Sequence, residues 1–139
     1  MRNVGAVVAG VLVVGLIVLV LQWVGSALHP LPAGVDPMDP GDATAFAAYL
    51  ATMPFVGWAL AGASELIGAF FGSLVAGRLA TTRQSWFAGA IVCVALLGSI
   101  SNWVSFSHPM WFIVGQLVGY PLVFLGVTKL LPSNPYEGQ

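Results

Sequence analysis

The sequence has very little charge, with four basic and five acidic residues among 139. A soluble domain carries roughly a quarter of charged residues, so the 6% found here excludes an ordinary soluble domain and indicates a membrane protein. A formal net charge of -1 leaves no basic surface for nucleic acid, and we expect no nucleic-acid partner. The expected partner is the lipid bilayer.

Cysteine is equally scarce, because Cys93 is the single one in the chain. One thiol cannot form an intrachain disulfide or a Cys-x-x-Cys zinc or redox site. Cys93 lies in an apolar run, where we expect it to pack as a small hydrophobic side chain. The sequence shows no nucleophile–base pair and no carboxylate dyad, so we expect a protein that is not an enzyme and that has no cofactor.

Long apolar runs are what the chain has in abundance. A helix needs about 20 mainly apolar residues to cross a bilayer. Four segments meet this requirement, at roughly 4–28, 54–79, 86–106 and 110–131. We therefore expect an all-α membrane protein, a single integral membrane domain over 1–139 that folds as a four-transmembrane-helix bundle.

The basic residues predict how the bundle is oriented. In a four-span chain the N-terminus, the second connection and the C-terminus share one side, and that side carries Arg2, Arg78, Arg83 and Lys129. The positive-inside rule then places both termini in the cytoplasm, with 132–139 as a short tail. The first run is too long for a signal-peptide core, so we expect it to be a span. The expected location is a bacterial-type inner (cell) membrane.

The outer connection 29–53 is the only long one. It begins with a Pro- and Gly-rich stretch that is unsuited to a helix. The run 39–42, Asp-Pro-Gly-Asp, then predicts a helix start with Pro at the first helical position. An apolar stripe follows at helical spacing and comprises Phe46, Tyr49, Leu50 and Met53. We expect a short interfacial helix over about 40–52, at the outer membrane surface.

Two stretches of the chain read alike, QWVGSALHP at 22–30 and NWVSFSHP at 102–109. The second and fourth spans also share a pattern, ELIG at 65–68 and QLVG at 116–119, each followed at the same interval by a basic residue. We interpret the chain as two similar helical hairpins, related by a pseudo-two-fold axis along the membrane normal.

Each span contributes one large polar side chain at a similar depth: Gln22, Glu65, Asn102 and Gln116. At 1.5 Å per residue the three amides lie roughly 9–12 Å inward from the histidines. An ionisable residue at such a depth is a functional-site candidate. We therefore expect a ligand- or ion-binding layer centred on Glu65, with Ser64 beside it. Glu65 is either a protonated hydrogen-bond donor or a carboxylate in a wet cavity that opens outward, and the amides alternatively fix the register of the helices.

The two histidines, His29 and His108, are expected at the outer face. Their functional interpretations are haem ligation, a metal site with Asp36, Asp39 or Asp42, and pH sensing. The simpler alternative is that each His-Pro pair ends one helix or begins another at the membrane interface. No HxxxH or comparable ligand spacing is present.

Small residues recur at every fourth position in two spans, as Gly68 and Gly72 in the second and as Gly115 and Gly119 in the fourth. Such spacing lets helix backbones approach closely. The strips pack helices either within one chain or between subunits. A homo-oligomer and a larger membrane complex are therefore both expected as possible assemblies.

The stretch ASELIG at 63–68 is similar to that around the essential membrane glutamate of small multidrug-resistance transporters, which are also four-span chains. In that family the glutamate is on the first span and here it is on the second. The resemblance implies, by analogy, a transport role for Glu65. Three functions stay open: binding or transport of a small solute, cation or proton at Glu65; a non-catalytic accessory subunit of a larger membrane complex; and a haem or metal protein through His29 and His108.

Overall fold

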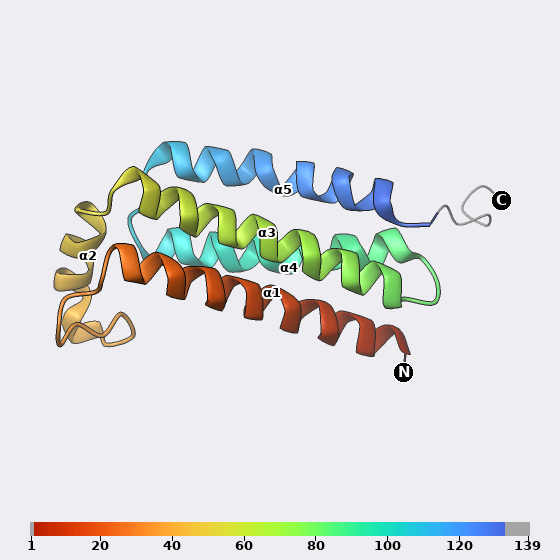
Figure 1. Ribbon diagram of the computed structural model, residues 1–139, viewed down its shortest axis with the longest axis horizontal. Coiled ribbons are helices and arrows are strands. Elements are labelled where there is room, and N and C mark those ends of the chain that lie inside the picture. Colours follow the sequence, from red (N-terminus) through yellow and green to blue (C-terminus); the bar gives the residue numbers. More distant parts are fainter. Residues whose placement is uncertain (1, 133–139) are drawn as a thin grey trace.

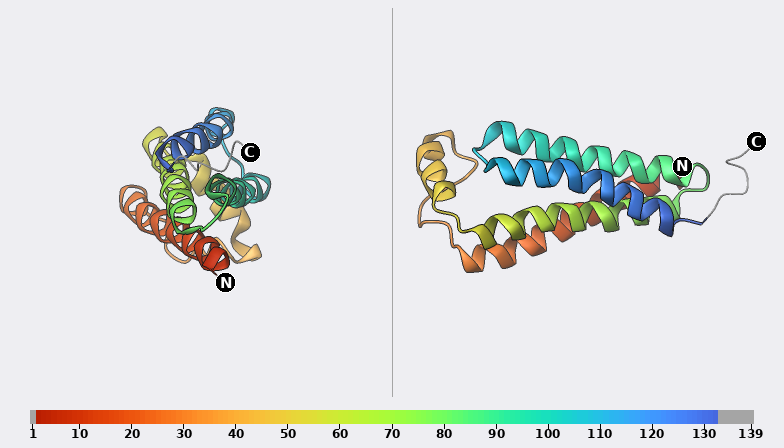
Figure 2. Two further views of the ribbon diagram at one scale, coloured as in Figure 1. Left: turned by 90° about the vertical axis from the view of Figure 1, so that its right-hand side faces the viewer. Right: turned by 90° about the horizontal axis from the view of Figure 1, so that it is seen from above.

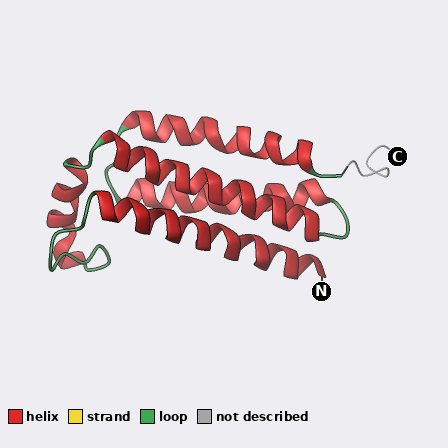
Figure 3. Cartoon of the chain, viewed as in Figure 1, coloured by secondary structure: helices red, strands yellow, loops and turns green. Residues whose placement is uncertain are grey.

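The computed structural model describes residues 2–132, and within that range the regular structure is all helical (Figures 1 and 3). The elements are α1 (Arg2–Leu28), the 3-10 helix η1 (Pro40–Asp42), α2 (Ala43–Ala51), α3 (Phe55–Leu79), α4 (Gln84–Ser105) and α5 (Met110–Leu130). The prediction of an all-α fold is confirmed. The expected tail falls almost entirely outside the described residues.

Four of these helices, α1, α3, α4 and α5, are long and apolar enough to cross a membrane. Their bounds agree within two residues with the four apolar runs of the sequence. The agreement is close because Pro30, Pro54, Pro109 and Pro132 stand beside helix ends, and the polar stretch 81–84 separates the second run from the third. The structure therefore supports a multi-pass helical membrane protein.

Helix α3 is the centre of the bundle. It packs against α1, α4 and α5, as the end-on view in Figure 2 shows. Among the described residues α1 also meets α4 but makes no contact with α5. A two-fold axis relating the hairpin α1–α3 to the hairpin α4–α5 would make the α1–α5 pair equivalent to α3–α4. Because only α3–α4 is packed, the duplicated hairpin stays a prediction from the sequence.

Glycines bring α1 and α3 into close backbone contact. A Cβ atom at Gly72 would lie 2.6 Å from the carbonyl oxygen of Gly10, and one at Gly10 would lie 2.8 Å from the carbonyl oxygen of Gly72. One turn away, a Cβ at Gly68 would lie 3.1 Å from the carbonyl oxygen of Val14. The small-residue strip of α3 is therefore used within the chain, against α1, rather than left open for a second subunit.

The strip on α5 is used differently. A Cβ at Gly119 would lie 2.6 Å from the Leu66 side chain of α3, so this glycine makes room for a neighbour. A Cβ at Gly115 would meet nothing within 4 Å. Only one of the two glycines therefore serves the packing of the described helices.

The basic residues gather at one end of the bundle, which we call the basic end. Arg2 is the first residue of α1, and Arg83 is the N-cap of α4. Arg78 and Lys129 lie in the last turns of α3 and α5. The Asn3 side chain joins the start of α1 to the second connection, because its Oδ1 accepts hydrogen bonds from the Thr81 N–H at 3.0 Å and the Thr81 hydroxyl at 2.9 Å.

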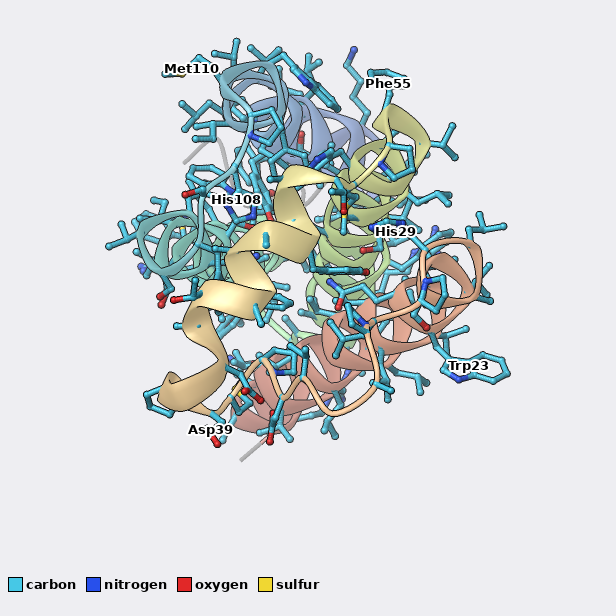
Figure 4. The ribbon with its side chains drawn as sticks, turned by 90° about the vertical axis from the view of Figure 1, so that its left-hand side faces the viewer. Trp23, His29, Asp39, Phe55, His108 and Met110 are labelled. Atoms are coloured by element: carbon cyan, nitrogen blue, oxygen red, sulfur yellow. The ribbon has the colours of Figure 1, made fainter. Side chains whose placement is uncertain are left out.

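Helix α2 lies across the opposite end of the bundle, roughly perpendicular to the long helices (Figure 1). The Asp39 side chain caps the preceding turn by accepting from the Gly41 N–H at 2.8 Å, and Pro40 occupies the first helical position. The helix start predicted at 39–42 is thus confirmed. Figure 4 looks onto this end, with α2 in front of the bundle.

Candidate functional site

A cavity of about 410 Å³ lies beneath α2, and we call it the end cavity. It is lined by the end of α1, the first connection, α2, α3, α4 and the start of α5. The whole apolar stripe predicted for the connection faces it: Phe46, Tyr49, Leu50 and Met53. Helix α2 therefore covers the bundle end with its apolar face turned inward.

Three of the four polar residues predicted to share a layer line the end cavity. They are Gln22 from α1, Glu65 from α3 and Asn102 from α4. Among the described residues the two amide side chains form no hydrogen bond, and so both amides are free to meet a ligand. The aromatic rings of Trp58 and Phe112 also line the cavity. The cavity is thus aromatic toward α2 and polar where Glu65 lies.

A serine hydroxyl holds the Glu65 carboxyl group, and a tyrosine hydroxyl holds the serine in turn. Ser99 of α4 donates its Oγ hydrogen to Glu65 Oε2 at 2.6 Å, and Ser99 Oγ lies 2.6 Å from Tyr120 Oη of α5. A hydroxyl has one hydrogen to donate. When Ser99 donates to Glu65, Tyr120 must therefore donate to Ser99. Tyr120, Ser99 and Glu65 form one hydrogen-bonded chain across three helices.

No described Lys or Arg side chain reaches this chain of groups. The described Lys and Arg residues stand at the basic end, and none lines a cavity that Glu65 lines. Ser99 is the one described residue that hydrogen-bonds to the carboxyl group. An unpaired carboxyl group in an apolar bundle is costly unless a further partner meets it. Glu65 therefore offers an acceptor to whatever enters the cavity.

A second cavity, which we call the lateral groove, lies between α1 and α4 and has a volume of about 450 Å³. Its walls are apolar, with Val11, Val14 and Val18 on one side and Ile91 and Val94 on the other. It also touches the same three polar residues of the layer that line the end cavity. The Glu65 carboxyl group thus lies where the end cavity and the lateral groove meet.

Gln116 and Ser64 lie apart from both cavities. Gln116 is 2% exposed, and its Nε2 donates to the carbonyl oxygen of Gly62 at 3.0 Å, which ties α5 to α3. Its Oε1 is buried without a hydrogen-bond partner among the described residues. Ser64 is fully buried and donates to the carbonyl oxygen of Ala61, 2.7 Å away in its own helix. The structure brings neither residue to Glu65 as a ligand-binding group.

The two histidines line the end cavity at the boundaries of helices (Figure 4). The His29 ring stacks on Tyr49, with centroids 4.6 Å apart, and Tyr49 Oη donates to the His29 carbonyl oxygen at 2.7 Å. His108 Nδ1 lies 2.7 Å from the carbonyl oxygen of Phe106. His29 directly follows α1, and His108 directly precedes the N-cap of α5. Both His-Pro pairs therefore mark helix boundaries at the α2 end.

The acidic residues of the first connection fold that connection. Asp36 Oδ1 accepts from the Met38 N–H at 2.8 Å, and the Asp36 N–H donates to Asp42 Oδ2 at 2.8 Å. Asp39 caps the turn that follows. Within residues 2–132, no three His, Cys, Asp or Glu side chains are grouped so that they could hold a metal ion.

Two residues of the site, Ser99 and Tyr120, were missing from the sequence-based layer. A single serine or tyrosine in an apolar span is common, and only the folded geometry joins them to Glu65. Together the site offers a carboxyl, two carboxamides, two hydroxyls and aromatic faces, which suit a ligand that donates hydrogen bonds or carries positive charge. Comparisons of the chain with models of protein families, with curated proteins and with solved structures give no match.

Proposed function

We propose that the protein is a small integral inner-membrane protein that binds, and by that route transports, a small solute or cation at Glu65. The observation that carries the proposal is the end cavity, which extends from beneath α2 to this carboxyl group. A cavity of about 410 Å³ falls within the usual range of small-molecule sites. It combines an apolar lining with a few convergent polar groups, as such sites do.

The proposed orientation follows from charge. The basic end faces the cytoplasm, so that both chain termini are cytoplasmic. The end cavity then opens toward the outer side, and α2 lies along the outer membrane surface. In this arrangement α2 works as a cover, because its apolar stripe faces the cavity and its other face meets the aqueous side.

The proposed ligand is cationic or rich in hydrogen-bond donors. Glu65 and the carboxamide oxygens of Gln22 and Asn102 are hydrogen-bond acceptors on the cavity lining. A positive group that reaches Glu65 also supplies the partner that the carboxyl group lacks. An anion would meet Glu65 without any compensating Lys or Arg among the described cavity residues.

Substitution of Glu65 tests the proposal. Purified protein in nanodiscs is titrated calorimetrically with ethylammonium, a cation small enough to reach the carboxyl group through the end cavity. We expect Glu65→Gln to weaken binding at least tenfold, because the substitution removes the charge and keeps the shape. The matched control is Asp39→Asn, which removes an exposed carboxylate of the first connection that lines neither cavity of Glu65. Equal binding by wild type and Glu65→Gln would refute the proposal.

A further inference from the structure

The lateral groove separates α1 from α4 over the part of the bundle nearer to α2. The two helices approach each other near Gly10, where an added Cβ would lie 3.0 Å from the Ile91 side chain. Beyond that point the groove walls are partly open to the surroundings, with Val11 41% and Val94 50% exposed. Because α1 and α4 are both candidate membrane spans, the groove opens toward the apolar interior of the bilayer.

Two glycines widen the groove. Gly15 of α1 and Gly98 of α4 line it, and a Cβ atom at either position would meet nothing within 4 Å. The groove is therefore broad enough to receive a chain of methylene groups between the two helices. Its valine and isoleucine walls would meet such a chain with apolar contacts alone.

The inner side of the groove is polar, which an ordinary lipid tail does not require. Glu65, Ser99 and Tyr120 all line it, together with the two amides that also line the end cavity. No Lys or Arg lines the groove among the described residues. A molecule that fills the groove thus meets apolar walls along its length and hydrogen-bond acceptors at one end. This combination matches an amphiphile whose head donates hydrogen bonds and carries no negative charge.

We propose that the lateral groove binds the alkyl chain of such an amphiphile, whose head lies at Glu65 and which reaches the site from the bilayer. The inference deepens the proposed function and rests on it, because it names the ligand class of the same site. The chain lies between α1 and α4, and the head lies at the junction of the groove and the end cavity. The carboxyl group then gains the partner that the described residues do not supply.

Substitutions that fill the groove test the inference. The probe is radiolabelled octylammonium, bound to the protein in nanodiscs, with the signal of empty nanodiscs subtracted. Gly15→Leu and Gly98→Leu add a side chain that lines the groove, and the Cβ at either position meets nothing within 4 Å. The matched control is Gly115→Leu, which also enters open space but lines neither cavity. Sodium octanoate is the competitor of opposite charge.

We expect the groove-filling variants to bind octylammonium at least tenfold more weakly than wild type, while Gly115→Leu binds it normally and octanoate does not compete. Ethylammonium, which has no long chain, should bind to Gly98→Leu as it does to wild type. Unchanged octylammonium binding in Gly15→Leu and Gly98→Leu would overturn the inference, and it would leave the proposed function intact if Glu65→Gln still loses ethylammonium. Full competition by octanoate would also overturn the inference, because it would show a groove open to any acyl chain.

Discussion

Replacement of Gly72 by alanine should weaken the contact between α1 and α3. The added Cβ would lie 2.6 Å from the carbonyl oxygen of Gly10, about 0.8 Å short of the 3.4 Å at which ordinary van der Waals contact begins. The Val14 side chain lies closer still and could rotate, but the backbone oxygen cannot, so one helix must move outward. A gap of about 0.5–1 Å between the two helices removes a quarter to a half of the van der Waals energy of each atom pair along the interface. Overpacking of this kind costs about 1–3 kcal/mol.

The helix propensity of alanine offsets part of that cost, by about 0.5–1 kcal/mol. We therefore expect Gly72→Ala to lower the free energy of unfolding by about 0.5–2 kcal/mol. The assay is unfolding in mixed micelles of increasing SDS content, followed by far-UV circular dichroism. Gly115→Ala is the control, because its Cβ meets nothing within 4 Å and should leave stability unchanged or slightly raised. The reasoning is refuted if the two variants unfold at the same SDS fraction.

Two further predictions concern hydrogen bonds. Ser99→Ala removes the hydrogen bond that Ser99 donates to the Glu65 carboxyl group. The substitution should lower the free energy of unfolding by about 1–3 kcal/mol in the same assay. A decrease below about 0.5 kcal/mol would contradict the hydrogen bond. Burial raises the pKa of the Tyr49 hydroxyl above its ordinary value of 10.0. The protonated hydroxyl therefore contributes its full stability below pH 10, and this contribution is lost as the pH rises through the raised pKa. A spin label introduced by Ala48→Cys in a Cys93→Ser background should therefore gain mobility only in strongly alkaline buffer. The same label in the Tyr49→Phe variant, which cannot donate to the His29 carbonyl oxygen, should be mobile at every pH. Equal mobility of the label in the two proteins at neutral pH would contradict this role.

The sequence predicted what depends on local chemistry. Long apolar runs, separated by prolines or by a short polar stretch, predicted the four long helices to within two residues, and the run 39–42 predicted the start of the short helix. The stripe that includes Phe46 and Tyr49 was predicted as one face, and the structure turns this face toward the cavity. These features could be predicted because each depends on residues close together in the chain.

The rest depends on how the helices are rotated and which of them meet. Gln116 was predicted at the depth of Glu65, yet depth does not determine direction, and α5 turns this amide toward Gly62. The close contact of Gly10 cannot be predicted from the sequence, because α1 is apolar on all sides and no face of it indicates which helix it meets. Ser99 and Tyr120 come from spans whose sequences give no sign of a link to the carboxyl group. Tertiary packing alone joins these residues.

The most direct test of the central claim is whether Glu65 can be reached from the α2 end. Glu65→Cys and Gln116→Cys, each in a Cys93→Ser background, would be treated with a small charged thiol reagent that cannot cross the membrane. Gln116 is the control because it lies at a similar depth and lines neither cavity. We expect the reagent to label position 65 from the outer side of intact cells and to leave position 116 unlabelled. Protection of both positions, or equal labelling of both, would contradict a cavity that leads from beneath α2 to Glu65.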